Sequence, residues 1–290
     1  MHWISPRNIS RSFRIVVALG VIFTALVAFS ALSRAANGMA GATSRAKSAT
    51  ALGFAEDSKT QSDDGLPAGT ILPVRLPSIS SKNAKAGDKI KAKLAQDVRL
   101  PDGSTIRGGA TVRGEVVAVT NASATRGATL TIKFDALLRH GKSTNVQTHL
   151  RAMASMMEVA EAQMPTSGPG ESDVYDWLTT RQVGGDSVYG KQGPVVGKSQ
   201  TVGQSTYQGV FVRLLASADG RCRGGAAGND RLQAVWVFSA DACGLYGFGD
   251  LEIRNAGRTE PLGEIILESK RGPVKIREGS AALLRVDEQE

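Results

Sequence analysis

The sequence is poor in histidine, cysteine and aromatic residues, and each shortage limits the functions to be expected. Its 290 residues include three histidines, two cysteines and 5% aromatic residues. A zinc site needs three or four clustered ligands, and the spacing of these residues does not supply them. We therefore expect no metal or other cofactor. His140 and His149 are interpreted as ordinary polar residues.

The sequence also lacks a basic run with interleaved aromatic residues, which is typical of a nucleic-acid groove. The formal net charge is +8, but four arginines lie in the first forty residues, which contain no acid. The excess that is left is small and spread along the chain. We expect no nucleic-acid partner.

Glycine, in contrast, is plentiful, with 33 residues. Few aromatic residues and many glycines favour short strands joined by tight turns over long packed helices. We therefore predict a mainly β protein. Its expected parts are an N-terminal signal or anchor helix, a small antiparallel β-barrel or sandwich, a linking helix and a second β domain that carries a disulfide.

The N-terminal region predicts export. Basic residues precede an uncharged apolar stretch of eighteen residues, 15–32, which is short for a membrane span and long for a signal-peptide core. Small residues come after it, so both a cleaved signal peptide and an uncleaved inner-membrane anchor remain open. Either reading places the rest of the chain across the membrane. We expect a protein that is periplasmic, anchored in the inner membrane or secreted.

Changes in composition and periodicity predict the organisation of the chain. Residues 41–65 are small, polar and without periodicity, as in a flexible tether. The predicted parts are the signal peptide or anchor at 1–40, the tether at 41–65, a β-barrel or sandwich at 66–149, a helix with a Gly/Ser-rich connector at 150–207, and a second β domain at 208–290.

Within 66–149, several segments alternate apolar and polar residues, as strands with one buried face do. The clearest are 88–98, 110–120 and 128–138. Ile90, Ala92 and Leu94 are predicted to share a face. The doubled valine at 116–117 indicates a bulge or burial on both sides.

Residues 149–164 change period. Leu150, Met153, Met157 and Ala160 recur at three- and four-residue steps, which predicts an amphipathic helix packed on the core. A methionine-rich groove for a partner is the alternative.

The second predicted domain holds both cysteines. Cys222 and Cys243 are separated by twenty residues. In an oxidising compartment such a pair is most often a structural disulfide, which would stabilise the domain by about 3 kcal/mol. We predict this disulfide.

The segment GPVVGKSQ, 193–200, is similar to a phosphate-binding loop but one residue too short. Gly193 precedes Gly197, Lys198 and Ser199 by three residues instead of four. The residues after Ser199 are polar and do not continue as a helix, so we interpret the segment as a flexible connector.

Motifs for hydrolysis are incomplete. GGDSVYG contains Asp186 and Ser187 in the order of the GDSL hydrolase nucleophile block, but no histidine lies after it to accept the serine proton. Ser187 is therefore interpreted as a loop residue. Glycan cleavage would need two carboxylates. The acids considered for that role are Glu115, Asp135, Asp176, Asp241, Asp250 and Glu252, and the sequence assigns no pair among them.

Residues 66–149 carry a resemblance to a known family. Their opening contains Leu66, Pro67, Gly69 and Thr70, and Gly87 marks the next turn. A later block contains Ile106, Gly108, Gly109, Val112 and Gly114. This pattern resembles the C-terminal β-barrel domain of conjugative-transfer and type IV secretion core-complex proteins, and also secreted β-rich proteins of unassigned function from soil bacteria.

The resemblance to the core-complex family implies a homo-oligomeric scaffold that crosses the cell envelope. Arg107 stands where that family has proline, and the tether lacks the family's proline-rich run. Our main hypothesis is an exported cell-envelope binding or scaffold protein without catalysis, with envelope proteins or a glycan as partner. The alternatives are a secretion-channel component and an envelope glycan hydrolase.

Overall fold

The computed structural model describes residues 65–139, 141–166, 178–215, 231–254 and 263–288. The predicted signal or anchor at 1–40, the tether at 41–65 up to residue 64, and Cys222 lie outside these ranges. Among the described residues, no helix is long and apolar enough to cross a membrane.

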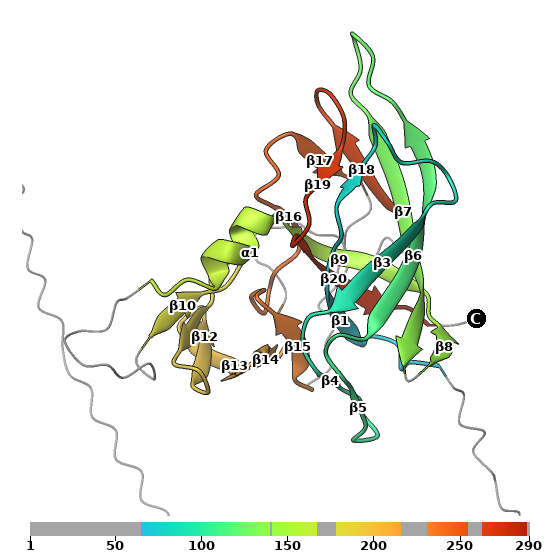
Figure 1. Ribbon diagram of the computed structural model, residues 1–290. Helices are drawn as coiled ribbons and strands as arrows, with labels where there is room; N and C mark the ends of the chain where they lie inside the picture. The colour runs from blue at the N-terminus through green and yellow to red at the C-terminus, as the bar shows by residue number, and fades with distance from the viewer. Residues whose placement is uncertain (1–64, 140, 167–177, 216–230, 255–262, 289–290) are drawn as a thin grey trace, which may run out of the picture. The chain divides into compact units, whose positions relative to one another are not determined.

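Over the described residues the protein is mainly β, as predicted, and these residues form two large sheets and one short helix (Figure 1). The larger sheet curves into a nearly closed barrel. Its strands follow the order β16-β9-β20-β1-β3-β6-β7-β18-β17, and β8 pairs with β7. These strands are β1 (Ile71–Arg75), β3 (Lys89–Leu94), β6 (Thr111–Thr120), β7 (Thr129–Arg139), β8 (Lys142–Asn145), β9 (Thr148–Ala154), β16 (Gly244–Tyr246), β17 (Leu251–Ile253), β18 (Ile265–Ser269) and β20 (Ala281–Val286).

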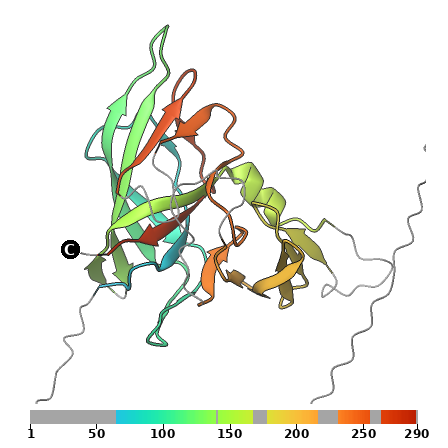
Figure 2. The same ribbon diagram turned by 180° about the vertical axis from the view of Figure 1, so that it is seen from behind.

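The smaller sheet is a half-barrel in which six strands pair in sequence order, each antiparallel to the next. Figure 2 shows this curved layer from behind, next to the helix. Its strands are β10 (Thr179–Arg181), β11 (Ser187–Tyr189), β12 (Pro194–Gly197), β13 (Gln200–Thr206), β14 (Gly209–Val212) and β15 (Gln233–Trp236).

Two small ribbons complete the strand pairing. In one, β2 (Ile79–Ser80) pairs with β19 (Lys275–Ile276). In the other, β4 (Val98–Arg99) pairs with β5 (Thr105–Ile106). The helix is α1 (Met156–Ala162).

The alternating strands of the barrel confirm the sequence pattern. In β3, Ile90, Ala92 and Leu94 are all buried on one face while the lysines between them are exposed. The register between β6 and β7 shifts between Val116 and Ala118, which confirms the bulge predicted at the doubled valine. Because of this shift, Ala118 is exposed.

Three barrel strands, β1, β9 and β20, lie between two hydrophobic cores and contribute residues to both. Neighbouring residues of β1 face opposite sides: Leu72 lies in the barrel core and Ile71 in the core under the half-barrel. The same division separates Leu284 from Leu283 in β20. Side chains of successive strand residues point to opposite faces, so such a strand is apolar throughout.

The prediction of a helix at 149–164 is wrong for the first half of this range. Residues Thr148–Ala154 form β9, in which every residue is buried, and the helix starts only after Ser155. The Ser155 side chain accepts a hydrogen bond from the Glu158 amide and caps the helix. Met157, placed in the predicted apolar stripe, is 63% exposed. A strand buried on both faces has no alternation to separate it from a buried helix.

The strands of the barrel come from both sides of the boundary predicted between residues 207 and 208. β20 pairs with β1 and β9, and β18 pairs with β7. The range predicted as a helix with a connector, 150–207, contains four strands of the half-barrel sheet. The two sheets therefore divide the chain differently from the predicted domains.

Candidate functional site

Two adjoining hollows lie at the half-barrel sheet. Their volumes are about 280 and 360 Å³, and Gly190, Lys191 and Tyr207 line both. The larger hollow is also lined by Tyr189, and the smaller one has Trp236 in its wall. Since the hollows share three residues, we treat them as one elongated site and call it the tyrosine groove.

Tyr207 is the most exposed large hydrophobic residue at this groove, at 78%, in the turn between β13 and β14. Several hydrogen bonds fix that turn. The Asp97 amide donates to the Gln208 side-chain oxygen at 2.9 Å, and Thr206 Oγ1 donates to the Gly209 carbonyl at 3.0 Å. The ring is therefore presented to solvent on a braced turn, which lowers the entropy lost when a ligand binds.

Tyr189, 48% exposed, lies at the end of β11 beside a second braced turn. Ser205 Oγ lies 3.1 and 3.0 Å from the carbonyl oxygens of Gly190 and Gly193, so its single proton is shared between them. A Cβ at Gly193 would lie 1.6 Å from the Tyr189 carbonyl oxygen, so only glycine fits there. Both tyrosines thus belong to turns that are held against the same strand, β13.

The lining of the groove is polar but almost uncharged. Among the described residues that line the two hollows, Lys191 is the single charged one. Amide and hydroxyl side chains supply the other polar groups: Gln192 and Gln208 are exposed, whereas Ser205 is buried. Gln182 is buried, and its amide nitrogen donates to the carbonyls of Trp236 and Val237 at 3.1 Å in the orientation that satisfies both. The groove is therefore suited to a ligand with hydroxyl or amide groups.

Two side chains, Arg75 and Gln96, connect the groove wall to the rest of the protein. The guanidinium of Arg75, in β1, lies 4.4 Å from the centre of the Trp236 ring. Gln96 Nε2 donates to the Val210 carbonyl at 3.2 Å. Trp236 has φ 54°, a strained value that these contacts help to hold.

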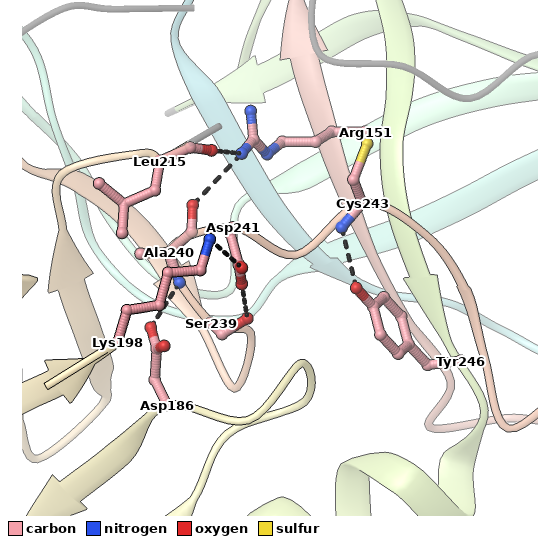
Figure 3. Close-up of polar contacts among 9 residues, drawn as sticks. All are labelled: Arg151, Asp186, Lys198, Leu215, Ser239, Ala240, Asp241, Cys243 and Tyr246. Atoms are coloured by element: carbon pink, nitrogen blue, oxygen red, sulfur yellow. Dashed lines mark hydrogen bonds and ion pairs between the residues drawn. The ribbon is translucent and has the colours of Figure 1, made fainter. Parts of the chain in front are cut away.

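Asp186 and Asp241 form a separate polar cluster with Lys198 and the loop after β15 (Figure 3). One Asp186 oxygen accepts from the Ala240 amide at 2.7 Å. Asp241 accepts from Ser239 Oγ at 2.9 Å and pairs with Lys198 at 3.2 Å. Burial raises the pKa of Asp186 above its ordinary value, and the negative charge of Asp241 adds to this, against the Ala240 amide and Lys198.

This cluster connects the segment predicted as a flexible connector to the loop after β15. Residues 193–200 form the hairpin of β12 and β13, and Lys198 and Ser199 occupy its turn with φ 50° and 65°. The prediction of a flexible connector is wrong here, since the segment is a paired hairpin. It lacks the strand-to-helix setting of a phosphate-binding loop.

The other acids considered for glycan cleavage do not meet in a hollow. Glu115 and Asp135 both pair with Lys133, at 3.0 and 3.8 Å, on the barrel surface. Asp135 and Asp250 line two different hollows. Glu252 pairs with Lys270, and Asp176 lies outside the described residues. None of four hollows formed by the described part of the chain is lined by two acids.

Arg151 occupies the interior between the two sheets (Figure 3). It is fully buried and donates to the carbonyls of Ala242, Leu215 and Ala240 at 3.1 to 3.3 Å. Cys243, next to Ala242, is buried as well, and its amide donates to the Tyr246 hydroxyl at 3.0 Å. Because Cys222 lies outside the described residues, the disulfide stays a prediction.

His149 is not a surface residue. It is 1% exposed in β9, and its Nδ1 pairs with the buried carboxylate of Asp287. In the described ranges no three histidine, cysteine or acidic residues gather closely enough to hold a metal. His140 lies outside those ranges, and Ser187 starts β11.

Comparisons with protein-family models, curated proteins and solved structures find no match for this chain. The resemblance to core-complex barrels therefore remains a prediction from the residues named above. The sequence pattern alone does not identify the tyrosine groove. The signal it offers is Tyr207 within the polar segment STYQG, where an aromatic residue in a glycine turn has no core to join.

Proposed function

We propose that the protein is an exported, non-enzymatic binding module of the cell envelope and that its tyrosine groove holds a glycan strand. The observation that carries this proposal is the exposure of Tyr189 and Tyr207, at 48% and 78%, beside hollows lined by amides and hydroxyls. Two exposed aromatic rings that line one hollow form an apolar surface, and such a surface rimmed by polar groups is typical of a binding site.

A sugar ring matches this lining in two ways. Its C–H face is apolar and packs on an aromatic ring, while its hydroxyl and acetamido groups exchange hydrogen bonds with amide and hydroxyl side chains. Tyrosine suits such contacts because it offers a large rigid surface with little side-chain entropy to lose. The adjoining hollows favour a chain of several sugar units over a single one.

The charge of the groove supports an uncharged glycan. With Lys191 as the single charged lining residue, the groove has little to hold a polyanion. Export, which the N-terminal sequence predicts, would place the groove where envelope glycans are found.

The test is titration calorimetry of the purified full chain with the hexasaccharide of N-acetylglucosamine. We expect Tyr207→Ala to raise the dissociation constant about tenfold or more. Truncation of an aromatic contact at the centre of a binding site costs about 1–2 kcal/mol or more of binding free energy. Leu232→Ala is the matched control, since Leu232 is 40% exposed and lines none of the hollows described above.

The proposal fails if the hexasaccharide does not bind, or if both substitutions weaken binding equally. Release of shorter sugars during the titration would favour the hydrolase instead. The secretion-channel alternative is separated by light scattering in detergent: a ring of many copies would favour it, and a monomer would exclude it.

A further inference from the structure

A third hollow, of about 460 Å³, is lined by residues from the start of α1, the β16–β17 turn and the chain from β18 to β20. The volume is in the range of small-molecule sites. We call it the basic hollow. It shares no lining residue with the tyrosine groove.

Three cations line the basic hollow: Arg271, Lys275 and Arg277. All three are exposed and lie within seven residues of one another. Within the described part of the chain, none has an acidic group within 4.0 Å. Asp250 is the one acid among the lining residues, so the hollow has an excess of positive charge. Such an excess attracts an anion.

A buried hydroxyl provides independent evidence for a ligand. Ser280 lines the hollow and is 0% exposed, and its Oγ has no hydrogen-bond partner among the residues that the structure describes. A buried hydroxyl without a partner is costly, and native proteins rarely leave one. An anion in the hollow would accept its proton.

Part of the lining is apolar. Met157, 63% exposed, lines the hollow together with Met156 and Phe248. Methionine adapts to irregular shapes and packs well against rings. A ligand that contacts both the cations and the apolar residues has an anionic end and an apolar ring.

We propose that the basic hollow binds a phosphate monoester that carries an apolar ring. The phosphate oxygens accept from the guanidinium groups of Arg271 and Arg277, from Lys275 and from Ser280 Oγ. Arginine matches phosphate through paired N–H donors, which favours phosphate over a halide ion. The ring packs on Met157 and Phe248.

The experiment is calorimetry of the full chain with phenyl phosphate, with phenol and inorganic phosphate as the two halves of the probe. We expect phenyl phosphate to bind more tightly than either half. Arg277→Gln should weaken its binding about tenfold or more, and Ser280→Ala about tenfold, because each removes a hydrogen bond to a charged group.

Lys91→Gln is the matched control. It removes the same charge from a different hollow, which Lys89 and Arg113 also line. It should leave phenyl phosphate binding within about twofold, in line with the small effect of one distant surface charge. If Arg277→Gln and Lys91→Gln lost the same affinity for phenyl phosphate, the proposal would be overturned, because the binding of the anion would then depend on the net charge of the protein alone. Tighter binding of phenol than of phenyl phosphate would also overturn it.

Discussion

Replacing Arg151 by methionine should lower the free energy of unfolding, because this buried side chain connects the two sheets by hydrogen bonds. Arg151 belongs to β9, in the wall between the two cores, and it donates to carbonyls of the segments after β14 and β15. Methionine preserves the apolar stem and removes the guanidinium. The change therefore deletes hydrogen bonds with little change in packing.

The expected loss depends on the carbonyl groups left behind. The Ala240 oxygen keeps a second donor, the Leu215 amide at 2.9 Å, whereas the oxygens of Leu215 and Ala242 lose the guanidinium. Ala242 is buried, but Leu215 is partly exposed, so water can replace the guanidinium at its carbonyl. A buried acceptor without a partner costs about 1–3 kcal/mol. Removal of the buried charge recovers part of its desolvation cost, so we expect a net loss of about 1–3 kcal/mol. The free energy of unfolding of a folded protein is usually about 5–15 kcal/mol, so a loss of this size is measurable.

Urea unfolding followed by far-ultraviolet circular dichroism measures this loss. Arg113→Met is the control, because Arg113 is exposed and donates to Ser143 Oγ at 2.7 Å on the barrel surface. We expect the control to change the free energy of unfolding by less than about 0.5 kcal/mol. If Arg151→Met unfolds at the same midpoint as the control, the guanidinium does not join the sheets through these hydrogen bonds.

Three further substitutions test other features. Ser199→Gly should raise the free energy of unfolding by about 1 kcal/mol, because glycine adopts the positive φ of this hairpin turn without strain; urea unfolding would show no gain if the turn were absent. Asp186→Asn should become more stable relative to wild type as the pH rises from about 3.5 to 7. The pKa of Asp186 is raised in the folded wild-type protein, so the contribution of this carboxyl to wild-type stability is present below the unfolded pKa and is lost as the pH rises through the folded pKa, whereas asparagine does not titrate. A constant difference between the two proteins across that range would contradict this. Gly203→Ala should lower the melting temperature by several degrees, since its Cβ would lie 2.0 Å from the Phe211 carbonyl oxygen, and an unchanged melting temperature would contradict the tight pairing of β13 and β14.

The sequence predicts the fold best where one face of a strand is exposed to solvent and the other is buried. β3 alternates lysine with apolar residues, and the pattern gives both the strand and its buried face. The bulge at 116–117 is visible as a break in the same alternation. Local pattern suffices in these strands because burial has the same period as the backbone.

The pattern fails where burial is not one-sided or where pairing is distant. β9 is buried on both faces, so its apolar residues also fit a helical period. The return of β18 and β20 to the barrel depends on contacts with strands far earlier in the chain, which no local pattern encodes. The hairpin at 193–200 escapes prediction because Lys198 and Ser199 are unusual residues for positive φ.

The candidate site is the least predictable feature of all. Tyr189 and Tyr207 come from separate turns, and only the sheet brings both to the same hollow. Asp186 and Asp241 are likewise far apart in sequence and meet through the hairpin and the loop after β15. The sequence offers Asp241 as one acid among several, without the means to pair it.

The central claim is that the tyrosine groove holds a glycan strand, and hydrogen-exchange mass spectrometry of the full chain tests it most directly. The hexasaccharide of N-acetylglucosamine should slow exchange in peptides that cover residues 189–193 and 205–209, the two turns at the groove, and leave 271–280 unchanged. Protection confined to other segments, or none at a saturating concentration, would contradict the account.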